Sequence, residues 1–351
     1  MVYLIVIIAL CIGFDFINGF HDAANSIATV VSTKVLNPIQ AVVWAAVFNF
    51  IAYFIAKYFI GFRVAGTVQN TVNSDMIDPQ VIMVIIIGGL VAAIVWSLLT
   101  WWKAIPSSSS HTLVGGLAGA ALAACGWNAV QWGTVGLIAL FIIVAPLIGF
   151  VAGNLIMILT MWIFRRTKPH KMDKWFRRLQ LLSSAFLSLG HGLNNSTKEI
   201  GVIACAIVAF QNMPGMELPS FLAPSASLER WGVFVPEWAA FACFTAIAVG
   251  TMSGGWRIIK TMGNKITKVT PVEGFCAQTA GAIAIGVSQA VSMPVSTTHV
   301  ISGSIMGVGS VKRLSAVRWG VSIDMITAWV VTIPVSAAIG AACYWLIALC
   351  M

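Results

Sequence analysis

Long apolar runs restrict how this chain can fold more than any other feature. Segments such as 39–60 and 80–102 carry almost no charge, and each has the ~20 residues that a helix needs to cross a bilayer. The 351 residues are 59% hydrophobic and only 9% charged, whereas soluble proteins carry about 25% charged residues. The runs do not show the alternation of an outer-membrane barrel. We therefore predict an all-α polytopic membrane protein.

The positions of the basic residues predict its orientation. Of 20 Lys and Arg residues, seven fall in the stretch 165–180, while the connections 61–79 and 211–237 carry more acidic than basic residues. Because short basic loops stay in the cytoplasm, we predict a multi-pass protein of a bacterial-type inner (plasma) membrane, with 165–180 as a basic cytoplasmic loop. The clustered charge is then a topology signal, and we expect the lipid bilayer as a partner but no nucleic acid.

Two hydroxyl-rich elements stand out inside the apolar sequence. Residues 106–111 read Pro-Ser-Ser-Ser-Ser-His and residues 294–299 read Pro-Val-Ser-Thr-Thr-His, and both continue with Gly nine and thirteen positions after the Pro. Pro favours the first turn of a helix, and the free N–H groups and hydroxyls of a helix start bind anions. Two ordinary N-caps are the alternative. The matching copies favour an anion site, because unpaired hydroxyls in hydrocarbon are costly.

Two polar knots, residues 18–26 and 190–199, interrupt other apolar segments. Asp22 is an ionisable group among apolar residues, which indicates function by default. With the neighbouring Asn and Ser side chains it could hold a small cation, and Gly19 would permit local unwinding of the helix. In the second knot Lys198 either pairs with Glu199 or faces an anion. The alternative for both knots is a cluster of interhelical hydrogen bonds.

The order of these motifs repeats along the chain. Each half contains a knot, then apolar spans, then a hydroxyl-rich element, and the basic connections fall on one side only if the halves cross the membrane in opposite directions. This pattern is typical of inverted-repeat transporters, whose sites lie near the midplane between the repeats. We predict two inverted-topology repeats, 1–164 and 181–351, of about five membrane segments each, with discontinuous or re-entrant helices at the midplane.

Other classes of protein fit the sequence less well. No nucleotide-binding loop of the GxxxxGK[ST] type is present, so an ion gradient is the expected energy source. The serines lack a His–Asp pairing at a usable spacing, and we do not expect an enzyme. Four of the five His residues, His21, His111, His191 and His299, are spread over four elements without Cys or carboxylates at ligand spacing, and we expect no metal site and no cofactor.

The motifs together resemble the inorganic phosphate transporter family, the bacterial low-affinity Pit-type permeases and their sodium-coupled relatives. The family's two signatures, Gly-x-Asn/His-Asp-x-Ala-Asn and His-Gly-x-Asn-Asp-x-x-Lys, correspond to Gly19–Asn25 and His191–Lys198. The family's paired Pro–hydroxyl–His elements correspond to the two elements described above. The resemblance covers nearly the whole chain and implies phosphate as the substrate, held by the hydroxyls and by the Asn and Asp side chains of the knots.

The chain also departs from the family's pattern. The second signature's Asp is Asn195 here, its usual Gln is Thr197, and Asn49 and Gln278 stand where sodium-coupled relatives carry acids. Fewer carboxylates would compensate a dehydrated sodium ion less well. We therefore expect coupling to a proton, or transport of a neutral metal–phosphate complex, with sodium as the second choice.

These observations predict inorganic phosphate uptake by cation-coupled symport with alternating access, with a homodimer as a possible assembly. The expected phosphate ligands are Asn25, Ser108, Ser109, Ser110, Asn194, Asn195, Ser296, Thr297 and Thr298, and the expected coupling-ion ligands are Asp22, Asn25, Asn49, Asn195 and Gln278. A permease for sulfate or another oxyanion is an alternative, because helix-terminus donors bind any tetrahedral anion. An ion channel that uses the hydroxyls as a filter is the other alternative.

Overall fold

The computed structural model describes residues 1–62, 65–66, 70–293 and 295–350. Pro294 of the second hydroxyl-rich element and positions 63–64 and 67–69 of the connection 61–79 therefore lie outside the described residues. The main helices are α1 (Val2–Ser32), α2 (Pro38–Ile55), α4 (Pro79–Trp102), α5 (Ser109–Cys125), α6 (Trp132–Ile163), α7 (Pro169–Gln211), α8 (Ala226–Glu229), α9 (Glu237–Ser253), α10 (Trp256–Lys260), α11 (Pro271–Ala290), α12 (Thr297–Ser310) and α13 (Trp319–Leu349).

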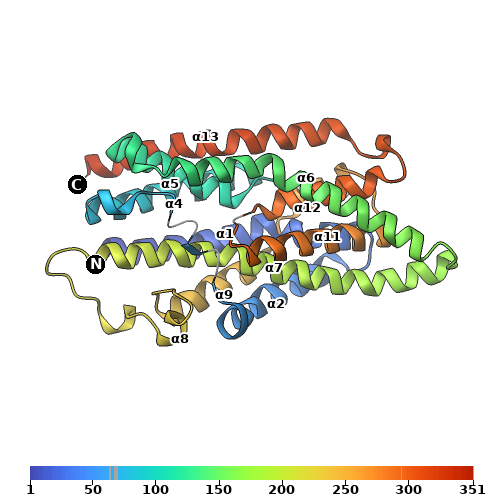
Figure 1. The fold of residues 1–351 in the computed structure, drawn as a ribbon, viewed down its shortest axis with the longest axis horizontal. Helices are drawn as coiled ribbons and strands as arrows, with labels where there is room; N and C mark the ends of the chain where they lie inside the picture. Colours follow the sequence, from blue (N-terminus) through green and yellow to red (C-terminus); the bar gives the residue numbers. More distant parts are fainter. Residues whose placement is uncertain (63–64, 67–69, 294, 351) are drawn as a thin grey trace.

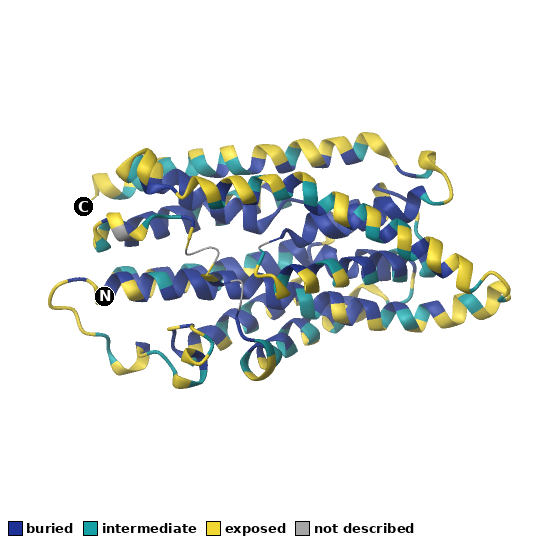
Figure 2. Ribbon diagram, in the orientation of Figure 1, coloured by how far each residue is buried: buried dark blue, intermediate teal, exposed yellow. Residues whose placement is uncertain are grey.

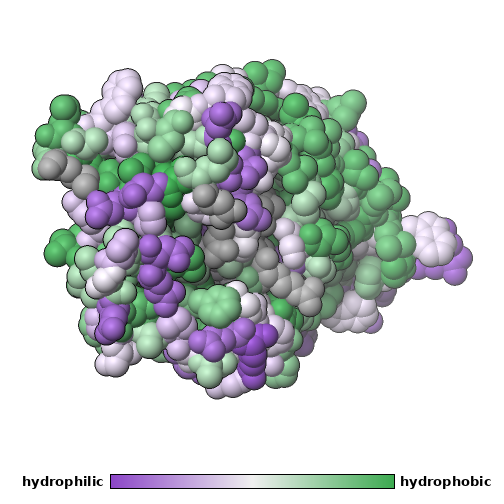
Figure 3. All heavy atoms as spheres, turned by 60° about the vertical axis from the view of Figure 1, so that its left-hand side comes forward, coloured by the Kyte–Doolittle hydropathy of each residue, from purple (hydrophilic) through white to green (hydrophobic). Residues whose placement is uncertain are grey.

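These helices confirm the predicted all-α membrane class. Among the described residues, five helices are long and apolar enough to cross a membrane, or six if α9 and α10, bent by 60° at their junction, are taken as one broken span. The outer helices α6 and α13 expose large apolar side chains along their length, such as Leu155 and Ile323 (Figure 2). Viewed towards one end, the hydrophilic residues gather on the end face while the flank is apolar (Figure 3).

The bundle has two distinct ends (Figure 1). Both chain termini lie at one end, which we call the terminal end, and the connection 164–168 between α6 and α7 lies at the other, the basic end. Helix α1 runs from the terminal end to the basic end, and α7 runs in the opposite direction. At the basic end, Arg177 donates to the Lys34 carbonyl oxygen (3.2 Å) and Lys312 pairs with Glu273 (2.8 Å). Lys34, the start of α7 and Lys312 therefore lie at one end of the bundle, as expected. Lys103 does not, because it follows α4 at the tip of a hairpin, where Arg257 donates to the Trp102 carbonyl oxygen (2.9 Å).

Two helical hairpins enter the bundle from opposite ends and stop near its middle. The first hairpin, α4–α5, starts at the terminal end and turns back at 103–108, where the Trp101 ring lies 4.8 Å from Phe20, halfway along α1. The second hairpin, α11–α12, starts at the basic end and reverses direction after Ala290, where the Gln289 side chain donates to the Gly190 carbonyl oxygen (3.1 Å). Re-entrant backbone of this kind is tolerated at membrane depth only where protein covers it.

Each hairpin packs against the last long helix of the other half of the chain. A Cβ at Gly119 of α5 would lie 2.0 Å from the Ala337 carbonyl oxygen of α13, and one at Gly307 of α12 would lie 2.1 Å from the Phe150 carbonyl oxygen of α6. Both glycines stand thirteen residues after the Pro of their element. Only glycine allows backbones to approach this closely, which explains why both copies of the motif carry it.

The structure corrects two expectations. The stretch 165–180 is not a loop, because α7 begins at Pro169 and only 164–168 joins it to α6. Pro is favoured in a first helical turn, and the pair between Arg177 and Asp173 (2.8 Å) supports the turns that follow, at i,i+4 spacing. Gly19 does not unwind α1, which is helical from Val2 to Ser32. Its role is close packing, because a Cβ there would lie 2.1 Å from the Ile247 carbonyl oxygen of α9.

Candidate functional site

The tips of the two hairpins meet in the middle of the bundle. Ser108 caps α5 by accepting from the His111 N–H, and Ser296 caps α12 by accepting from the His299 N–H, both at 3.3 Å. The Thr298 hydroxyl donates to the Ser107 carbonyl oxygen (3.1 Å), so the two tips are in direct contact. Both capping serines are buried. Two helix N-termini therefore approach one another from opposite directions, and their first-turn N–H groups have no intrahelical partners.

The first polar knot lies beside the tip of the first hairpin. His21 donates from Nδ1 to Asp22 Oδ1 (2.8 Å), and its Nε2 lies 3.1 Å from the Thr100 hydroxyl and 3.4 Å from the Ser107 hydroxyl. The second Asp22 oxygen, Oδ2, lies 3.8 Å from His191 Nε2 of α7. Asp22 is only 2% exposed. Its carboxylate is therefore held between one histidine from each half of the chain.

The second polar knot converges on the same place. Asn195 donates from Nδ2 to Asn18 Oδ1 (3.3 Å), and this Nδ2 also lies 3.0 Å from His191 Nε2. His191 Nδ1 lies 3.2 Å from Asn49 Oδ1, and Asn49 donates in turn to the Thr251 hydroxyl (2.8 Å). Three of the predicted coupling-ion ligands, Asp22, Asn49 and Asn195, therefore share His191 as a neighbour.

Each knot also reaches the hairpin of the other half. In α1, Asn25 donates to the hydroxyls of Thr297 (3.2 Å) and Thr298 (3.0 Å) of the second hairpin. In α7, the Lys198 ammonium group donates to the Ser110 hydroxyl of the first hairpin (2.6 Å). Aligning the two signatures pairs Asn25 with Lys198, and aligning the two hydroxyl-rich elements pairs Thr298 with Ser110. The contacts are thus reciprocal.

Most of the predicted phosphate ligands surround these contacts. Asn194 donates to the Val295 carbonyl oxygen at the second tip (3.0 Å) and to Asn195 Oδ1 (3.2 Å), which also accepts from Lys198 (3.1 Å). The remaining predicted ligands, Ser109, Ser110 and Ser296 among them, are buried in or next to the first turns of α5 and α12. The structure therefore brings these side chains together around the meeting point of the hairpins.

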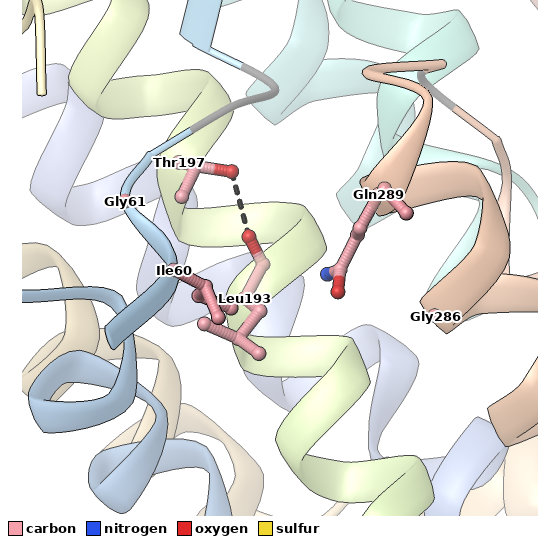
Figure 4. A pocket seen from close by; sticks show the side chains of 7 residues that line it. Ile60, Gly61, Leu193, Thr197, Gly286 and Gln289 are labelled. Carbon is pink, nitrogen blue, oxygen red and sulfur yellow. Dashed lines mark hydrogen bonds between the residues drawn. The ribbon is translucent and has the colours of Figure 1, made fainter.

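Two side chains lie apart from this cluster. Gln278 accepts from the Ser183 hydroxyl and donates to the Ser26 carbonyl oxygen, both at 3.0 Å, and it has no hydrogen bond to the other predicted coupling-ion ligands within the described residues. Thr197 donates to the Leu193 carbonyl oxygen of its own helix (2.6 Å). It lines a largely apolar cavity of about 180 Å³ between α7 and α11, with Gly286 and Gln289 on the opposite wall (Figure 4).

Four residues of this region were absent from the predicted ligand sets. His21 and His191 flank Asp22, Thr100 joins His21 to the first hairpin, and Lys198 contacts Ser110. Thr100 carries no signal in the sequence, because it belongs to an apolar run. Lys198 could have been included among the predicted ligands. It is only 2% exposed, and a buried ammonium group needs anionic or dipolar partners.

The cluster presents several hydrogen-bond donors that suit an anion and one carboxylate that suits a cation. Two helix N-termini, the Lys198 ammonium group and the amide groups of Asn25 and Asn194 are donors suited to an oxyanion. Asp22 supplies a carboxylate suited to a cation or proton. An anion and a cation could therefore bind side by side, each reducing the cost of burying the other.

Comparisons with known proteins agree with this chemistry. The model of the phosphate transporter family matches residues 18–174 and 164–340. A protein of Rhizobium meliloti described as a probable low-affinity inorganic phosphate transporter is 45% identical over 343 residues, covering 97% of this chain and 96% of its own length. One of Bacillus subtilis with the same description is 41% identical over 351 residues, covering 99% and 98%.

A solved structure shares the fold. It is described as "The sodium-dependent phosphate transporter", and it superposes with a TM-score of 0.83 at 23% identity, covering 100% of both chains. The family match and the relatives span nearly the full chain and agree with the resemblance seen in its motifs. The chain belongs to the phosphate transporter family.

Proposed function

We propose that this protein takes up inorganic phosphate across the inner (plasma) membrane by cation-coupled symport. Phosphate would bind between the N-termini of α5 and α12, with Lys198 and the amides of Asn25, Asn194 and Asn195 completing the site. The reciprocal contacts of Asn25 with Thr298 (3.0 Å) and of Lys198 with Ser110 (2.6 Å) carry this proposal. These contacts place a hydrogen-bond donor from each half of the chain next to the hairpin tip of the other half.

Alternating access would follow from the arrangement of the two halves. We take 1–164 and 181–351 as inverted repeats, since α1 and α7 run in opposite directions and the hairpins enter from opposite ends. Rocking of one hairpin and its supporting helix against the other would open the central site to one end at a time. The basic end, including the 164–168 connection, would face the cytoplasm.

Asp22 would take the coupling cation. A proton or a neutral metal–phosphate complex is favoured, because Asn195, Asn49 and Gln278 provide amides where sodium-coupled relatives carry acids. Sodium is the second candidate. It is supported by the structurally similar protein, which is described as sodium-dependent, and by the oxygens of Asp22, Asn49 and Asn195 around His191.

Uptake by the purified protein in liposomes tests this proposal. Labelled phosphate uptake is measured while a pH gradient and a sodium gradient are imposed in turn. Saturable accumulation that depends on the pH gradient is expected, and flux that neither saturates nor follows a gradient would contradict symport and indicate a channel. Competition by sulfate separates phosphate from a general oxyanion substrate, because sulfate at equal concentration would reduce labelled phosphate uptake by an oxyanion permease and leave uptake by a phosphate-selective one unchanged.

A further inference from the structure

Two buried acids lie outside the roles assigned above. Asp15 of α1 is 0% exposed and Glu199 of α7 is 1% exposed. Asp15 precedes Asp22 by seven residues on the same helix, which places it ~10 Å from Asp22 along the axis. Because α1 starts at the terminal end, Asp15 lies between that end and the phosphate site. An ionisable pair at this depth is expensive and calls for a function.

The two acids form one electrostatic cluster. The Asp15 and Glu199 carboxylates interact with each other and with the thiols of Cys11 and Cys243. The Ser196 hydroxyl donates to Asp15 Oδ1 (3.2 Å). Asp15 Oδ2 and Glu199 Oε2 are buried and have no hydrogen-bond partner among the described residues. Buried carboxylate oxygens are normally paired, so these two oxygens indicate a missing positive partner.

The balance of charge in the core points the same way. Within the part of the chain that the structure describes, Lys198 is the cation that Asp15 and Glu199 face, and its ammonium group donates to Ser110 and Asn195, which are neutral. Three acids, Asp15, Asp22 and Glu199, therefore surround this one lysine. A bound phosphate adds further negative charge. One cation at Asp22 leaves this interior with excess negative charge, and uncompensated buried charge is strongly destabilising.

The surroundings favour a proton over a metal cation. Hard cations such as Ca²⁺ and Mg²⁺ take six or more oxygen ligands, whereas this cluster offers two free carboxylate oxygens next to two thiols. Neutral thiols are poor ligands for hard cations. Apolar side chains such as Phe14 and Phe244 complete the buried surroundings of α1 and α9. A proton needs a single oxygen and no coordination shell.

We propose that Asp15 and Glu199 form a second proton-binding station, between the terminal end and the phosphate site. One proton binds there in each transport cycle, in addition to the cation at Asp22, and dissociates on the opposite side of the membrane with the phosphate. The station rests on the cation-coupled phosphate uptake proposed above. It raises the number of positive charges that accompany each phosphate by one.

The number of coupled protons can be measured directly. Liposomes containing the purified protein receive a series of pH gradients without sodium, with the membrane potential clamped at zero, and the limiting phosphate accumulation ratio is recorded. Each coupled proton multiplies this ratio tenfold per pH unit, since one unit corresponds to 1.36 kcal/mol per proton. The Asp15→Asn/Glu199→Gln double variant should therefore accumulate tenfold less phosphate per pH unit than the parent, while phosphate exchange at equal pH continues.

Controls separate this station from the phosphate site. Asp173→Asn removes an exposed acid of the basic end and should leave the slope unchanged. Asp22→Asn should abolish accumulation altogether, whereas the double variant should only lower the accumulation ratio per pH unit. An unchanged slope in the double variant would overturn the station. A second series applies sodium gradients at equal pH, and a double variant that loses slope in this series but not in the pH series would overturn the assignment to a proton.

A second readout does not depend on transport. Infrared difference spectra of the purified parent, with and without phosphate, should contain protonated-carboxyl intensity beyond the contribution of Asp22, and the double variant should lack this additional intensity. The single variants Asp15→Asn and Glu199→Gln should each reduce it, so the test holds if the double variant fails to fold. A band that is unaltered in both single variants would overturn the station.

Discussion

The two polar knots occupy equivalent places in the two halves but carry different chemistry. Asp22 in α1 corresponds to Asn195 in α7, and Asn25 in α1 corresponds to Lys198 in α7. Both knots lie on continuous helices, and both reach the hairpin of the other half. The first knot therefore contributes a carboxylate and an amide, whereas the second contributes an amide and an ammonium group.

This difference teaches how a near-symmetric scaffold can bind two unlike ions. A strictly symmetric site would present the same charges from both halves, so neither half would favour one sign of charge over the other. Here α1 provides the charge that attracts a cation, and α7 provides the charge that attracts an anion. The hairpin tips add hydroxyls and helix N-termini from both halves, which favour the anion.

The largest effect is expected from removing the charge of the first knot. Asp22→Asn should abolish concentrative phosphate uptake in liposomes, because the carboxylate that binds the coupling cation is lost. The protein should still fold and be expressed, since Asn can accept the His21 hydrogen bond (2.8 Å). Unchanged accumulation would remove Asp22 from the coupling role.

Removing the charge of the second knot should affect affinity more than coupling. Hydrogen bonds from charged groups are worth about 1.5–3 kcal/mol, so Lys198→Met should raise the half-saturation concentration for phosphate roughly 10- to 100-fold. Lys168→Met, at the exposed start of α7, is the matched control and should leave the half-saturation concentration for phosphate unaltered. If Lys198→Met lost only the response to the gradient and kept its affinity, the division between the knots would be wrong.

A smaller effect is expected at the hairpin tips, which both halves supply alike. Ser109→Ala combined with Thr297→Ala removes one buried hydroxyl from each tip. At about 0.5–1.5 kcal/mol for each hydrogen bond, the half-saturation concentration for phosphate should rise about tenfold. Each single variant should account for a similar part of this increase in the half-saturation concentration. An unaltered value in the double variant would count against hydroxyl coordination of phosphate.

The smallest effect is expected from making the knots more alike. Asn195→Asp restores the carboxylate that the second signature usually carries. The new carboxylate would stand where the Asn195 amide nitrogen now lies 3.0 Å from His191 Nε2. A second carboxylate would compensate a dehydrated cation better, so uptake should gain a severalfold stimulation by sodium. Comparing initial rates with sodium and with choline measures this. Equal rates would show that position 195 does not decide the coupling ion.

The sequence predicted the fold class and most of the site from a few local signals. Apolar runs indicated membrane helices, and the repeated Pro–hydroxyl–His elements indicated two buried helix starts, now seen as the N-termini of α5 and α12. The sequence predicted discontinuous or re-entrant helices at the midplane, and the contacts of the two hairpins were needed to choose the re-entrant form. The 24-residue length of α4 fits a full span, yet its end lies at Phe20, halfway along α1.

Other features depended on tertiary structure and left no local signal. Gly19 was expected to unwind α1, but glycine equally permits close packing, and only the approach of Ile247 distinguishes the two uses. The basic stretch before residue 181 was taken for a loop because charge marks orientation rather than secondary structure. Gln278 was grouped with the coupling-ion ligands by its position in the resemblance, whereas its hydrogen bonds lead to Ser183 and the Ser26 backbone.

The most direct test is a structure of this protein determined with bound phosphate. The anion should lie between the N-termini of α5 and α12, within hydrogen-bonding distance of Ser110, Thr298 and Lys198, one partner from each hairpin and one from the second knot. An anion bound away from both hairpin tips, or hairpins that enter from the same end, would contradict the central claim that two oppositely directed halves share one phosphate site.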